Sequence, residues 1–143
     1  MRKQLGKLIW IVCLLVLSCS GVLSGSAYDQ YYNGDTNYEF ACIQMGTPYY
    51  VDKNSIQSQL YQPPNYRLSA IVYAYISKTG MLSYPSVVTF EYNYDTKEVY
   101  SCDQNGRRYT NKPLRTDYYA SQADMRAMAK AKVIWRTAYN MEW

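Results

Sequence analysis

Strand-forming runs separated by turn residues between residues 66 and 110 predict a meander of antiparallel strands, and in one run apolar and polar side chains alternate with a period of two. The clearest run spans residues 86–94, and its alternating apolar side chains are Val88, Phe90, Tyr92 and Tyr94. Residues 67–77, 97–102 and 107–110 also consist mainly of strand-forming residues. Asn105-Gly106 separates the last two runs and favours a type I′ hairpin turn, because both residues tolerate positive φ.

Two further strands are predicted before this meander. Residues 37–45 alternate in the same way, and residues 49–51 form a short second strand that ends at Asp52. The side chains of Asp52 and Asn54 favour a tight or 3₁₀ turn over residues 52–56, because they accept hydrogen bonds from nearby backbone amides. Residues 55–62 fit more than one structure, and Pro63-Pro64 ends any helix that begins there.

A helix is predicted at the C-terminal end of the chain. Ser121 is a suitable N-cap, and Asp124 three residues later completes a capping-box pattern. Apolar residues then recur at three- and four-residue spacing and form one stripe: Ala127, Met128, Ala131, Ile134, Trp135, Ala138 and Tyr139. The basic residues on the opposite side are Arg126, Lys130 and Arg136, a number that is ordinary for a solvated face. We therefore predict an α+β fold, with about six antiparallel strands in a meander and one C-terminal helix packed on the sheet.

The first 27 residues have the pattern of a secretory signal peptide. A basic start precedes an unbroken apolar run over residues 8–17, and Gly25-Ser26-Ala27 suits signal peptidase. This predicts removal of residues 1–27, a flexible tether over 28–36 and a domain over 37–143. A second interpretation is a lipoprotein, because Val16-Leu17-Ser18-Cys19 resembles a degenerate lipobox with Cys19 as the lipid attachment site. Both interpretations predict an exported protein of the periplasm or cell surface.

Charge and composition narrow the classes of partner. The formal net charge is +4, but three of the 15 basic residues lie in the leader, so 12 remain against 11 acidic residues. This near-neutral balance gives no sign of a nucleic-acid partner. All 18 tyrosines follow residue 27, and there are only two phenylalanines. Tyrosine suits both ordinary packing and a recognition surface, because it combines an apolar ring with a polar tip.

Two cysteines, Cys42 and Cys102, follow the leader. Because an exported protein enters an oxidising compartment, we expect a disulfide between them. The alternative is a pair of buried free thiols.

No residue pattern predicts catalysis. The chain has no histidine, which excludes nucleophilic triads with histidine and every histidine-ligated metal site. It has no Cys-x-x-Cys pair, its seven glycines form no phosphate loop, and its carboxylates are dispersed. We therefore expect a non-enzymatic protein with no cofactor, no metal and no catalytic residue.

The run Tyr49-Tyr50-Val51-Asp52-Lys53-Asn54-Ser55-Ile56, followed by a meander and a closing helix, resembles the surface-adhesin protein E-like domain family. The resemblance covers roughly residues 40–139. It implies a small antiparallel sheet with one helix packed on it, and its named member is a bacterial surface lipoprotein that adheres to host extracellular-matrix proteins. The family often has a cysteine near the end of its last helix, whereas this chain ends in Asn140-Met141-Glu142-Trp143.

The expected function is binding of a protein partner through an exposed sheet edge or a tyrosine-bearing face. The basic pair Arg107-Arg108 is the candidate contact for an acidic partner, and the alternative is a solubilising charge on an edge. Two other functions fit the same sequence. One is a glycan- or cell-wall-binding module with tyrosine rings stacked on sugars, and the other is a structural envelope protein without a soluble ligand.

Overall fold

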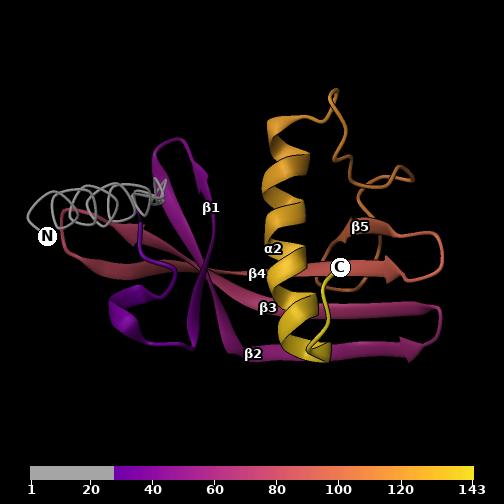
Figure 1. Ribbon diagram of the computed structural model, residues 1–143, viewed down its shortest axis with the longest axis horizontal. Helices are drawn as coiled ribbons and strands as arrows, with labels where there is room; N and C mark the ends of the chain where they lie inside the picture. The colour runs from indigo at the N-terminus through magenta and orange to yellow at the C-terminus, as the bar shows by residue number, and fades with distance from the viewer. Residues whose placement is uncertain (1–27) are drawn as a thin grey trace, which may run out of the picture.

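The computed structural model describes residues 28–143 as a five-stranded antiparallel sheet with one long helix packed on it (Figure 1). Each strand pairs with the next along the chain. The strands are β1 (Tyr38–Gln44), β2 (Thr47–Gln62), β3 (Asn65–Ile76), β4 (Met81–Asn93) and β5 (Glu98–Cys102), and the helix is α2 (Gln122–Tyr139). The predicted α+β meander with a C-terminal helix is confirmed, with five strands in place of about six.

The sixth strand is missing because the turn after β5 folds back on itself. The Asp103 carboxylate accepts hydrogen bonds from the backbone amides of Asn105 and Arg107, both at 2.9 Å. This closed turn leaves one isolated bridge, between Cys102 and Arg108, where we predicted a strand over residues 107–110.

β2 is much longer than predicted, because the expected turn at Asp52 is a bulge within one strand. The pairing of β2 with β3 is irregular between Asp52 and Gln57. Asp52 Oδ1 accepts a hydrogen bond from the amide of Asn54 at 3.0 Å, as the turn chemistry predicted. Ser55 Oγ accepts a hydrogen bond from the Ile71 amide of β3 at 2.7 Å, so a side chain carries the ladder across the bulge. The strand then continues to Gln62.

The core lies between α2 and the concave face of the sheet (Figure 1). Trp135 is the anchor that the sequence predicted, with 1% of its surface exposed. The Tyr92 hydroxyl donates a hydrogen bond to the Ala131 carbonyl at 2.8 Å and ties β4 to the helix. The buried members of this cluster are Val51, Leu68, Ala70, Val72, Phe90, Tyr92, Val99, Met128, Ala131, Val133, Ile134 and Trp135.

The helix begins as predicted, with Ser121 Oγ accepting a hydrogen bond from the Asp124 amide at 3.0 Å. Its buried face is broader than the predicted stripe, because the curled sheet covers more than one side of the helix. Val133 is buried although it lies outside the stripe, whereas Ala138 is exposed. Arg136 was predicted to be solvated, but it forms an ion pair with the buried Glu39 of β1.

Residues 28–36, predicted to be a flexible tether, pack beside β1 in the structure. Tyr31 forms an isolated antiparallel β-bridge with Glu39, and the Phe40 amide donates a hydrogen bond to the Gln30 carbonyl at 2.8 Å. A short 3₁₀ helix, η1 (Tyr32–Gly34), follows. The predicted signal peptide and the lipid attachment candidate Cys19 lie outside the described residues. Among residues 28–143, no helix is long and apolar enough to cross a membrane.

Candidate functional site

The predicted disulfide between Cys42 and Cys102 is absent, and both residues are buried free thiols. Cys42 lies on β1 and Cys102 on β5, the two opposite edges of the sheet, with three strands between them. A disulfide requires Cα atoms within about 7 Å of each other, so this strand order keeps the two residues apart. Burial raises the pKa of both thiols and keeps them protonated near neutral pH.

The candidate contact Arg108 is held within the domain. Its Nε donates to Glu91 Oε1 at 3.0 Å, and its guanidinium carbon lies 3.6 Å from the centroid of the Tyr100 ring. Arg67 Nη2 donates to the other oxygen of Glu91 at 2.8 Å. Arg107 is exposed and interacts with Asp103 through its backbone alone: its amide donates to the Asp103 carboxylate, and its carbonyl accepts from the Asp103 amide at 2.9 Å. The two arginines therefore differ, because Arg108 fixes the turn after β5 whereas Arg107 faces solvent.

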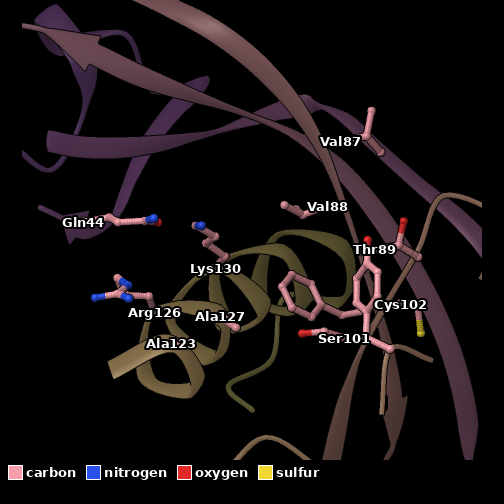
Figure 2. Close-up of a pocket in the computed structure, with 12 residues that line it drawn as sticks. Gln44, Val87, Val88, Thr89, Ser101, Cys102, Ala123, Arg126, Ala127 and Lys130 are labelled. Atoms are coloured by element: carbon pink, nitrogen blue, oxygen red, sulfur yellow. The ribbon is translucent and has the colours of Figure 1, made fainter. Parts of the chain in front are cut away.

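A different set of residues forms a groove between α2, β4 and β5 (Figure 2). We call it the basic groove. Its cavity has a volume of about 240 Å³. It is lined by Gln44, Val87, Val88, Thr89, Phe90, Ser101, Cys102, Tyr109, Ala123, Arg126, Ala127 and Lys130.

Two cations from α2 set the charge of the basic groove. Arg126 and Lys130 are four residues apart, so they lie on the same side of the helix. Figure 2 shows them with Gln44 on one side of the cavity, while Thr89, Ser101 and Cys102 lie on the other. Within residues 28–143, neither cation forms an ion pair with a carboxylate. Lys130 Nζ lies 5.0 Å from the centroid of the Tyr49 ring.

One side of β4 is free where it meets the basic groove. β5 pairs only with residues 89–93 of β4, so residues 81–88 have no strand neighbour on that side in the described part of the chain. A bulge at Tyr84-Pro85 interrupts this edge, since Val72 pairs with Ser86 and Ala74 pairs with Ser83. The regular part of the free edge is therefore residues 86–88. Val87 on this edge is 49% exposed.

The basic groove combines hydroxyl, amide, thiol and cationic side chains. The Thr89 hydroxyl oxygen is buried and has no hydrogen-bond partner among the described residues. The other polar side chains that line the cavity are the Gln44 amide, the Ser101 and Tyr109 hydroxyls, the Cys102 thiol and the two cations. No carboxylate or imidazole is among the side chains that line the cavity. Residues 28–143 also contain no group of three or more metal-ligating side chains.

The basic groove was not predicted from the sequence. Arg126 and Lys130 look like members of an ordinary solvated helix face, and their four-residue spacing was the only local signal. Comparisons with models of protein families, with curated proteins and with solved structures found no match. The resemblance to adhesin protein E-like domains therefore remains a prediction from residues 49–56 and the order of elements.

Proposed function

We propose that this protein is an exported cell-envelope binding module that holds an extended, acidic segment of a partner protein in the basic groove. The observation that carries the proposal is the free edge of β4 at residues 86–88, of which Val87 and Val88 line the same cavity as Arg126 and Lys130. Export follows from the leader pattern of residues 1–27 alone. Binding without turnover is part of this proposal, and its support is that no carboxylate or imidazole is among the side chains that line the groove.

The first support is the backbone of β4. An extended peptide adds to a free sheet edge through main-chain hydrogen bonds, and side-chain pockets then give selectivity. Since β5 ends at Cys102, opposite Thr89, a peptide beside residues 86–88 lies in line with β5 and continues the sheet. The bulge at Tyr84-Pro85 limits this pairing to a few residues. The edge therefore accepts one short strand.

The second support is the spacing of the two cations. Side chains four residues apart on a helix have Cβ atoms about 6 Å apart. In an extended peptide, side chains at alternate positions lie on one face about 7 Å apart. Arg126 and Lys130 therefore match carboxylates at alternate positions of a strand. Because neither cation has a carboxylate partner among residues 28–143, an acidic peptide gains attraction without displacing an existing ion pair.

The third support is the apolar part of the groove. Val88, Phe90 and Ala127 line the cavity together with the cations. Val88 and Ala127 are half-buried, so they offer apolar surface to one partner side chain. The favoured partner segment therefore combines acidic residues at alternate positions with an apolar residue nearby.

The test measures binding of fluorescent peptides to the processed, exported protein by anisotropy. A peptide of alternating glutamate and valine is compared with matched peptides in which glutamine or lysine replaces glutamate. We expect binding only of the glutamate peptide, with an affinity that falls as salt rises. Arg126→Gln together with Lys130→Gln should weaken binding by about tenfold.

Lys132→Gln is the matched control, because Lys132 is an exposed cation of the same helix that does not line the groove. It should bind the glutamate peptide as the parent protein does. Equal binding of the glutamate and glutamine peptides, or binding that survives the double substitution, would overturn the proposal. Light scattering tests the structural alternative, because a dimer that forms through the β4 edge would exclude the peptide.

A further inference from the structure

A second concave surface lies away from the two cations, where the segment before β1 meets β2 and β3. A hollow of about 300 Å³ is lined by Tyr28, Asp29, Tyr32, Asn33, Tyr50 and Tyr75. A neighbouring hollow of about 220 Å³ shares Tyr28 and Tyr75 and adds polar side chains from Thr47, Ser77 and Lys78. We call the two together the tyrosine cleft. In Figure 1 the segment that carries Tyr28 and Tyr32 is the indigo chain at the end of the sheet.

Hydrogen bonds hold the aromatic walls of the tyrosine cleft in place. The Tyr32 hydroxyl donates to the Gly80 carbonyl at 2.8 Å, and the Tyr50 hydroxyl donates to the Asp29 carbonyl at 3.2 Å. The Tyr32 ring lies 6.0 Å from the Tyr50 ring and 6.2 Å from the Tyr75 ring, measured between centroids. These rings therefore need little reordering when a ligand binds, which reduces the entropic cost of binding.

The walls remain accessible to a ligand. Tyr28, Tyr32 and Tyr75 are half-buried, so each ring keeps part of its surface in the cleft. The three rings lie outside the core cluster of the described residues, in a separate aromatic group with Tyr38, Phe40 and Tyr50. The tyrosine cleft therefore presents apolar ring surface that the fold itself does not cover.

Polar side chains that have no hydrogen-bond partner among the described residues line the first hollow beside these rings. The side chains of Asp29 and Asn33 are exposed, and neither forms a hydrogen bond with another residue of the described chain. Asn33 has a φ of 50° and precedes Gly34 with a φ of 76°, so a left-handed turn holds this amide at the cleft. The carboxylate of Asp29 in the first hollow is balanced by the ammonium of Lys78 in the second.

We infer that the tyrosine cleft binds a short, neutral oligosaccharide. A pyranose ring has an apolar face of C–H groups that packs on an aromatic ring, and hydroxyls at its rim that bond to carboxylate and amide groups. The cleft offers both kinds of surface within one hollow. Two hollows with two shared walls suit two successive sugar units. A purely apolar ligand would bury Asp29 and Asn33 without partners, which costs free energy.

Calorimetry and saturation-transfer NMR on the processed protein test this inference with three probes. They are a β-1,4-linked tetramer of N-acetylglucosamine, cellotetraose and an acidic tetragalacturonate. We expect at least one neutral tetramer to bind more tightly than the acidic one. Tyr75→Leu should weaken that binding by about tenfold, because it removes one of the two flat rings that both hollows share. Asp29→Ala tests the same site at an exposed residue, where folding is little affected, and should also weaken binding.

Tyr118→Leu is the control, because Tyr118 is 95% exposed and lines neither hollow. The double substitution Arg126→Gln with Lys130→Gln should leave sugar binding unchanged, which separates this site from the basic groove. Failure of both neutral tetramers to bind would overturn the inference. Neutral-sugar binding that survives both Tyr75→Leu and Asp29→Ala would overturn it as well.

Discussion

Glu39 of β1 and Arg136 of α2 are 97 positions apart in the chain, yet they form an ion pair in which the glutamate is 5% exposed. Lys53 Nζ of β2 lies 3.5 Å from the other oxygen of Glu39. The last turns of the helix are therefore attached to the first two strands by charge as well as by apolar packing.

Breaking this pair should destabilise the domain. Arg136→Met keeps most of the aliphatic stem but leaves Glu39 with Lys53 alone, so we expect a loss of about 2 kcal/mol in the free energy of unfolding. Urea denaturation measures the loss. Glu39→Gln and the double variant complete the thermodynamic cycle, and additive effects of the two substitutions would show that the pair contributes no coupling.

Gly106→Ala should destabilise the turn after β5. A Cβ at this position would clash with the guanidinium of Arg67, at 2.7 Å from its Cζ, and the residue has a φ of 80°. Arg67 cannot move away freely, because it donates to Glu91. We expect a loss of about 2 kcal/mol in thermal or urea unfolding.

Gly80→Ala is the matched control for that substitution. Gly80 has a φ of 66° but nothing within 4 Å of the added carbon, so it reports backbone strain alone. We expect Gly80→Ala to lower the free energy of unfolding by about 1 kcal/mol, half the loss expected for Gly106→Ala. Equal losses at the two glycines would contradict a close contact between Gly106 and Arg67.

Protonation of Glu91 should reduce the stability of the domain at acidic pH. Burial by itself raises the pKa of this carboxyl, but the hydrogen bonds and charges of Arg67 and Arg108 lower the pKa below its ordinary value of 4.5. Because the folded-state pKa is lowered, the stabilisation is present above pH 4.5 and is lost as the pH falls through the folded-state value. Glu91→Gln should therefore reduce stability at pH 7 and flatten its decline in acid. An unchanged acid profile in urea titrations would contradict this role.

Tyr92 should make the fold sensitive to alkali. Burial raises the pKa of its phenol well above the ordinary value of 10.0, and the nearby Tyr139 raises it further. Since the folded state binds this proton more tightly, the stabilisation is complete below pH 10 and declines as the pH rises above that value. Tyr92→Phe should cost about 1 kcal/mol at pH 7, because the hydrogen bond to Ala131 is lost. The same variant should lose less stability than the parent between pH 10 and pH 12, and an equal loss would exclude Tyr92 as a source of the alkaline transition.

The cysteines should titrate as two thiols. Unfolding the protein in guanidinium without reductant should expose both Cys42 and Cys102 to a thiol reagent, whereas the folded protein should react slowly because both side chains are buried. Reductant should leave the thermal midpoint unchanged. A protein that shows no free thiol until it is reduced would contradict the strand order that separates the two residues.

Local structure was largely predictable from the chain. The period of two predicted the strand around Phe90, and the capping pair Ser121 and Asp124 predicted the start of the helix. The three- and four-residue spacing of apolar residues predicted Trp135 as the residue that anchors the helix in the core. These features depend on backbone geometry and on neighbours within a few residues. The turn chemistry of Asp52 was also right, but only β3 could decide whether the strand ended there or continued through a bulge.

Both candidate sites bring together side chains from elements that are far apart in the chain. The pattern of α2 places Arg126 and Lys130 on a polar face, and only the tertiary structure brings that face to the free edge of β4. The same is true of Tyr28 and Tyr75, which meet across 47 positions because the segment before β1 packs beside β3. Sequence periodicity determines which face of an element is apolar, because it acts through local geometry. Strand order and curvature decide which faces meet, because they arise from packing over the whole chain.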